Sequence, residues 1–205
     1  MFYNILDQKR LKLLPLFKGF KKDFYLGGGT ALALQIGHRD SVDFDFFGSK
    51  EIDTKNLFIG LKKIFKERNI LKIQEEDNTL AVLADDTVKM SFFGYPYKLI
   101  DKITEEKNIR LASIQDIGCM KLSAITSRAT NKDYIDLYYI LQRISLKDLL
   151  EGASRKFYDL DRNLILKSLV YFKDVDAKDI NFKNNNYVDF KEVKKFLEKE
   201  TRKII

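Results

Sequence analysis

The sequence predicts an α+β fold, with a small mixed sheet and its helices in the first half and a helical C-terminal half. Short apolar runs of strand length, separated by polar turns, are concentrated before residue 100. From Ser113 onward the apolar residues recur at helical spacing instead. We therefore expect two domains, an α/β core at residues 1–104 and a helical domain at residues 105–205.

The expected elements follow one another along the chain. In the first half we predict helices at 5–20, 30–36 and 54–68, and strands at 24–26, 42–47, 71–74, 79–84 and 88–93. Pro15 is expected to bend the first helix, and Gly37 to end the second. In the second half we predict helices at 113–128 and 131–143, two that open at Ser145 and Asp161, and a last one at 190–203.

The composition indicates a cytoplasmic globular protein with no membrane partner. The 205 residues carry a net charge of +7, and no apolar run approaches the roughly 20 residues of a membrane helix. The N-terminus lacks a signal-peptide pattern, and a single cysteine, Cys119, excludes an internal disulfide. The positive charge permits a polyanionic partner such as nucleic acid, although a lysine-rich composition alone produces the same charge.

One stretch near the N-terminus combines a glycine-rich turn with a pair of aspartates. Gly28, Gly29 and Thr30 open a helix, and backbone N–H groups at a helix N-terminus bind phosphate. Asp43 and Asp45 share one face of the next strand, where they repel each other unless a cation lies between them. Proteins bind Mg²⁺ with one or two carboxylates together with substrate phosphates. The combination predicts a metal–nucleotide site, whereas each feature alone is more often a tight turn or a solvated strand face.

Three runs in this stretch match a known family. They are Gly28-Gly29-Thr30-Ala31-Leu32-Ala33, His38-Arg39-Asp40-Ser41 and Asp43-Phe44-Asp45-Phe46-Phe47. They resemble the AbiEii/AbiGii-type nucleotidyltransferase toxins of abortive-infection and toxin–antitoxin systems. A second block resembles the same family: Lys121-Leu122-Ser123-Ala124-Ile125 and Lys132-Asp133-Tyr134-Ile135-Asp136-Leu137. The resemblance implies a polymerase-beta-like nucleotidyltransferase core in the first half of the chain.

The second block contains a lysine and two aspartates whose positions allow two interpretations. Lys121 lies within the apolar stripe of its helix, so its ammonium either extends past the stripe to water or meets an anion. The resemblance favours the triphosphate of a nucleoside triphosphate as that anion. Because methionine keeps the length and apolar stem of the lysine, Lys121→Met is expected to leave folding intact. Asp133 and Asp136 lie on a helix face that is typical of a solvated stripe. Only the resemblance makes one of them a candidate catalytic residue.

The loop before the aspartate pair holds further polar residues. Arg39 and Ser41 either contact phosphate or only fix the loop. His38, the single histidine, is expected to be a loop residue and neither a metal ligand nor a general base.

One position departs from the superfamily pattern. Members usually carry a third carboxylate on a later strand, facing the first two, where it deprotonates the attacking hydroxyl. Ser91 occupies that position here, and a hydroxyl near neutral pH is a poor metal ligand and no base. A downstream aspartate, Asp133 or Asp136, then takes the role, or the activity is modest or lost.

The residues and the resemblance together predict a metal-dependent nucleotidyltransferase. The expected site residues are Asp43, Asp45, Lys121, Asp133 and Asp136 for catalysis, Gly28, Gly29, Thr30, Arg39, Ser41 and Lys121 for nucleotide binding, and Asp43 and Asp45 for Mg²⁺. The resemblance implies a nucleoside triphosphate as substrate, tRNA as the leading acceptor, a protein hydroxyl as the second, and a cognate antitoxin. The alternatives are a non-catalytic nucleotide- or RNA-binding protein of the same fold and a small-molecule nucleotidyltransferase.

Overall fold

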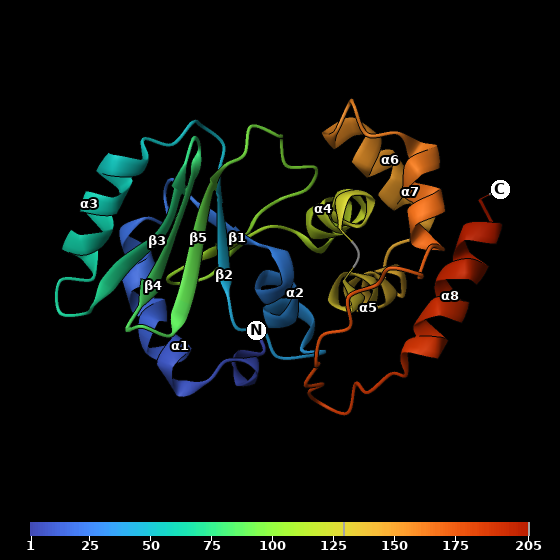
Figure 1. The fold of residues 1–205 in the computed structure, drawn as a ribbon, viewed down its shortest axis with the longest axis horizontal. Helices are drawn as coiled ribbons and strands as arrows, with labels where there is room; N and C mark the ends of the chain where they lie inside the picture. The colour runs from blue at the N-terminus through green and yellow to red at the C-terminus, as the bar shows by residue number, and fades with distance from the viewer. Residues whose placement is uncertain (129, 205) are drawn as a thin grey trace.

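The computed structural model describes residues 1–128 and 130–204, and it places a mixed sheet beside a group of helices (Figure 1). The strands are β1 (Tyr25–Gly27), β2 (Phe44–Gly48), β3 (Ile70–Glu76), β4 (Thr79–Ala84), β5 (Val88–Gly94), β6 (Thr104–Glu105) and β7 (Arg110–Leu111). Their order is β3-β4-β5-β2-β1-β7-β6. The pairs β2–β5 and β1–β7 are parallel, whereas β1 and β2 are antiparallel. The predicted α+β class with a mixed sheet is confirmed.

Helices cover both faces of this sheet. In the first half they are η1 (Tyr3–Ile5), α1 (Gln8–Leu13), η2 (Leu14–Gly19), α2 (Gly28–Ile36) and α3 (Thr54–Ile64). In the second half they are α4 (Ile114–Ser127), α5 (Asn131–Leu141), α6 (Leu146–Lys156), α7 (Arg162–Leu169) and α8 (Phe190–Arg202). Figure 1 shows α1 and α3 on one side of the sheet, and α2 with the C-terminal helices on the other.

The predicted helix at 5–20 is divided in the structure. The α-helix α1 ends at Leu13, and the 3₁₀ helix η2 follows it with Pro15 in its first turn. Proline has no N–H and its ring crowds the preceding turn, so a continuous α-helix through Pro15 is disfavoured. The predicted helix at 54–68 is also shorter, because α3 ends at Ile64.

The two central strands β2 and β5 direct their side chains alternately to the two faces of the sheet, one of which is entirely apolar. The apolar face consists of the buried residues Phe44, Phe46, Met90 and Phe92. Phe17 from η2 packs edge-on against it, with ring centroids 4.9 Å from Phe44 and 5.1 Å from Phe46. Alternation along the strands therefore directs Asp45 and Ser91 to the opposite face, toward α2.

A buried ion pair connects the helical half to the loop after β5. Lys156 on α6 lies 2.9 Å from Asp116 on α4, and both side chains are fully buried. The Asp116 carboxylate also accepts the backbone N–H groups of Ile100 and Asp101 at 2.9 and 3.1 Å. In addition, β7 follows residue 104 and still pairs with β1. The division of the chain into residues 1–104 and 105–205 stays a prediction.

Candidate active site

The glycine turn places the start of α2 directly against an aspartate. Gly28 has a φ of +62°, a conformation that glycine adopts without strain. A Cβ at this position would lie 3.1 Å from the Oδ2 atom of Asp45. Within the described residues no side chain caps the N-terminus of α2. Its first N–H groups are therefore available to an anion beside the Asp45 carboxylate.

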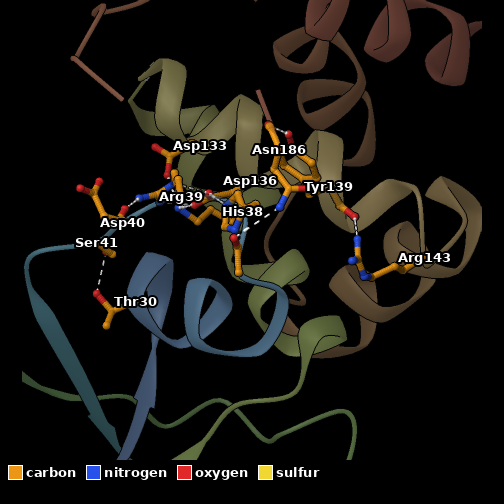
Figure 2. Close-up of polar contacts among 12 residues, drawn as sticks. Thr30, His38, Arg39, Asp40, Ser41, Asp133, Asp136, Tyr139, Arg143 and Asn186 are labelled. Carbon is orange, nitrogen blue, oxygen red and sulfur yellow. Dashed lines mark hydrogen bonds and ion pairs between the residues drawn. The ribbon is translucent and has the colours of Figure 1, made fainter. Parts of the chain in front are cut away.

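Thr30 and Ser41 attach the loop that precedes β2 to the helix. The Thr30 hydroxyl lies 2.7 Å from the Ser41 Oγ atom (Figure 2) and also donates a hydrogen bond to the carbonyl of Asp43. Thr30 is buried. Of the two interpretations of Ser41, the structure shows the contact that fixes the loop. Its expected contact with phosphate stays a prediction.

Asp43 and Asp45 flank Phe44, the first residue of β2. The strand begins at Phe44, one residue after Asp43, so Asp43 is exposed while Asp45 is partly buried. Burial and the neighbouring charge of Asp43 raise the pKa of Asp45, whereas the charges of Lys121, Lys89 and Arg128 oppose this shift. A further cation at this point would relieve the repulsion between the two carboxylates.

The donor atoms present suit a Mg²⁺ ion that arrives with nucleotide phosphates. Residues 1–128 and 130–204 contain no group of three or more histidine, cysteine, aspartate or glutamate side chains placed to hold a metal ion. Two carboxylates, those of Asp43 and Asp45, do lie two residues apart at the start of β2, and Asp45 is next to the uncapped start of α2. Mg²⁺ commonly takes one or two carboxylates and completes its shell with phosphate and water. The residues therefore fit the implied ion.

Asp136 on α5 is the centre of a buried polar network. Arg39 donates to it from Nε and Nη2, both at 2.8 Å, and the His38 Nε2 atom lies 2.7 Å away (Figure 2). The Lys121 ammonium lies 2.6 Å from the Oδ2 atom of Asp136. Burial opposes the charged form of Asp136, yet Arg39 and Lys121 hold its pKa well below the usual range. Asp136 thereby joins α5 to the loop after α2 and to α4.

Asp133 takes part in the same network one helical turn earlier. Its Oδ1 atom lies 2.6 Å from the Lys121 ammonium, and its Oδ2 atom accepts from Thr130 at 2.7 Å. Both Asp133 and Asp136 are buried, so the prediction of a solvated helix face is wrong for them. The reason is that this face of α5 packs against α4 and α2, and partner charges compensate the burial. Lys121 is buried too, and the anions it meets are these two aspartates.

A segment of the C-terminal half, residues 181–186, holds the loop that carries His38 and Arg39. Asp40 donates its N–H to the carbonyl of Asn181 at 2.9 Å, and Lys183 donates to the carbonyl of His38 at 3.0 Å. The Asn184 side chain donates to the carbonyl of Gly37 at 2.8 Å. The sequence predicts only a loop at Asn184-Asn185-Asn186. No local pattern reveals a contact across more than 140 residues.

His38 is expected to make stability fall as the pH drops below about 6.5, the ordinary pKa of histidine. Burial lowers the pKa of His38 even though Asp136 opposes this, so the unfolded chain binds the proton more readily than the folded chain. The contribution of His38 is therefore complete above that pH and is lost as the pH falls toward the lowered value. The raised pKa of Asp45 has the opposite effect on stability, because the folded chain binds this proton more readily than the unfolded chain does.

A comparison of variants isolates the histidine effect. Urea unfolding at pH 7.5 and 5.5 is expected to show a smaller loss for His38→Gln than for the parent, since an amide can still donate to Asp136 and does not titrate. An equal loss of stability in both proteins would contradict this prediction.

The family follows from a comparison with known proteins. The profile of the family described as "Nucleotidyl transferase AbiEii toxin, Type IV TA system" matches residues 16–202. The chain belongs to the AbiEii family. The matched residues include both blocks that carry the resemblance, and the polymerase-beta-like expectation for the fold agrees with the mixed α/β structure.

One relative by sequence and two solved structures are similar to this AbiEii protein. An uncharacterised protein of Aquifex aeolicus (strain VF5), aq_aa25, is 40% identical over 162 residues, which are 76% of this chain and 77% of the relative. A crystal structure of a candidate nucleotidyltransferase from H. pylori superposes with a TM-score of 0.59 at 20% identity, covering 97% of this chain and 96% of that one. MenT4, a nucleotidyltransferase toxin of Mycobacterium tuberculosis H37Rv, gives a TM-score of 0.58 at 14% identity, covering 93% and 80%. These two structures share the fold of the AbiEii chain. Within its described residues, no helix combines the length and apolarity needed to cross a bilayer.

Proposed function

We propose that this AbiEii protein transfers a nucleoside monophosphate from a nucleoside triphosphate to the hydroxyl of an acceptor, with Mg²⁺ as cofactor. One observation carries the proposal. The Asp45 carboxylate lies against Gly28 at the uncapped N-terminus of α2, and Asp43 precedes it by two residues. Carboxylates for a metal and N–H groups for phosphate are thus adjacent, which is the arrangement that binding a metal–nucleotide complex requires.

The residues of the glycine turn and of β2 divide the work of binding. Backbone N–H groups of Gly28, Gly29 and Thr30 hold phosphate oxygens at the start of α2. Asp43 and Asp45 would hold Mg²⁺, which would supply positive charge to the leaving pyrophosphate. In the transfer, the acceptor oxygen bonds to the α-phosphorus and the bond from that phosphorus to the bridging oxygen breaks. Pyrophosphate and the hydroxyl proton are released.

The buried network is assigned a positioning role. Asp133 and Asp136 have lowered pKa values and accept from Lys121 and Arg39, so they are weak bases at neutral pH. We propose that they orient Lys121 and Arg39 behind the glycine turn. The place of Arg39 supports this, because a Cβ on Gly29 would lie 2.5 Å from its Nη2 atom. The expected triphosphate contact of Lys121 then requires a nucleotide phosphate to share an ammonium that already has two carboxylate partners.

The preferred acceptor is tRNA, and the protein acts as a toxin with a cognate antitoxin. Membership of the AbiEii family supports the toxin role, and the net charge of +7 suits a polyanionic acceptor better than a small molecule. A protein hydroxyl is the second candidate acceptor. Cytoplasmic action follows from a tRNA acceptor. The alternative of a non-catalytic binding protein is motivated by Ser91, which pairs with Asp45 across the sheet where a third carboxylate is usual.

Label transfer tests the proposed reaction and the role of Ser91. Purified protein with Mg²⁺, each α-³²P-labelled nucleoside triphosphate and total tRNA is expected to yield labelled RNA. Ser91→Asp is expected to raise the rate because it adds a carboxylate beside Asp45. Ser91→Asn is the matched control, since it has the same shape without the charge. If neither RNA nor protein is labelled by the parent or by Ser91→Asp, the alternative of a non-catalytic binding protein is favoured.

A further inference from the structure

Lys89 extends the polar face that carries Asp45 and Ser91. Strands β2 and β5 run parallel with Asp45 opposite Ser91 and Phe44 opposite Met90. Lys89 precedes Ser91 by two residues, so its side chain shares the face of Ser91 and lies toward the Asp43 end of β2. Because β2 and β5 pair directly, this register places Lys89 beside the start of β2, where Asp43 and Asp45 lie. Lys89 is only partly buried.

The other cations of the site already have protein partners. Lys121 contacts Asp133 and Asp136, each at 2.6 Å, and Arg39 makes a two-pronged contact with Asp136. Arg128, which is largely exposed, lies 3.4 Å from Asp133. The ion pairs found within residues 1–128 and 130–204 do not include Lys89. It is therefore the site cation whose charge is most available to a ligand.

The charge balance indicates what that ligand is. A nucleoside triphosphate brings several negative charges to a place where Asp43 and Asp45 already contribute two carboxylates. The uncharged Ser91 hydroxyl is a poor ligand for a further metal ion, and an ammonium two residues away disfavours such an ion by like-charge repulsion. An ammonium on a flexible stem is a suitable partner for phosphate oxygens.

We propose that the Lys89 ammonium binds a phosphate of the nucleoside triphosphate, as a substrate-binding residue on β5 beside Ser91. The inference rests on the proposed function, because it assigns a residue to the same nucleotide site. Lys89 thereby supplies from the protein a positive charge on the side of the site where Ser91 replaces a metal-binding carboxylate. A purely structural role is the competing explanation, in which Lys89 only offsets the repulsion between Asp43 and Asp45.

Two variants and a control separate these explanations. Lys89→Gln removes the charge at similar length, Lys89→Arg keeps it, and Lys147→Gln removes a charge from an exposed position on α6. Binding of each nucleoside triphosphate with Mg²⁺ is measured by titration calorimetry at several salt concentrations, and the melting temperature of each ligand-free protein is recorded. We expect Lys89→Gln to weaken triphosphate binding about tenfold and to flatten its salt dependence. Lys89→Arg should retain most of the affinity, and Lys147→Gln should bind as the parent does.

Each result decides between the explanations. If Lys89→Gln binds the triphosphate as tightly as the parent does, the inference is overturned. If its melting temperature is also lower than that of the parent, Lys89 has the structural role instead. Weakened binding in Lys89→Gln that Lys89→Arg restores, with an unchanged melting temperature, supports the inference. A parent protein that binds no nucleoside triphosphate would contradict the proposed function itself, and that failure is visible before any variant is compared.

Discussion

Asp45→Asn is expected to abolish nucleotidyl transfer, with a loss of at least about 100-fold in rate. Asp45 is the residue where the glycine turn, the exposed Asp43 and the face of β5 meet. Without its charge, one carboxylate remains to hold Mg²⁺ against the phosphates. The rate is measured as transfer of α-³²P label to RNA, with Asp159→Asn at an exposed loop position as the control.

The same variant is expected to change stability in two opposite ways. Mg²⁺ with a nucleoside triphosphate should raise the melting temperature of the parent, because a ligand of the native state stabilises it, and Asp45→Asn should remove that rise. Without ligand, Asp45→Asn should melt at a higher temperature than the parent at pH 7. The raised pKa of Asp45 means that its ionised form costs folding free energy, and the asparagine carries no charge. A nucleotide-dependent rise that persists in Asp45→Asn would remove Asp45 from the nucleotide site.

Lys121→Met is expected to lower the free energy of unfolding by about 3–5 kcal/mol. The apolar stripe alone suggested that this change would be tolerated, but the structure buries the ammonium between Asp133 and Asp136. Removing it leaves two buried carboxylates with less compensation. Arg39 still contacts Asp136, so Asp133 loses most. Urea unfolding at pH 7.5 measures the effect, with Lys191→Met on the exposed face of α8 as the control.

A second substitution tests the cause of that loss. Lys121→Met combined with Asp133→Asn should be more stable than Lys121→Met alone, because the unpaired charge is then absent. A loss below about 1 kcal/mol in the single variant would show that the ammonium behaves as an exposed ion pair and has little energetic role.

The sequence was sufficient to predict those structural features that depend on neighbours along the chain. The positive φ at Gly28, the uncapped start of α2 and the approach of Asp45 are consequences of one continuous strand–turn–helix–strand unit. The strands at 79–84 and 88–93 were likewise predictable, because alternation and turn residues are local signals. The motifs that carry the family resemblance lie within the residues that match the AbiEii family, 16–202.

Only the tertiary structure decided which charges meet. Helical periodicity placed Asp133 and Asp136 on one face of α5, yet it could not show that α2 and α4 cover that face. It could not pair Asp136 with Arg39 and His38, which are almost 100 residues away, or bring residues 181–186 against the loop that holds them. The physical reason is that a periodic pattern reports which side chains of one element share a face. Whether a charged face meets water or an opposite charge depends on the element that packs against it.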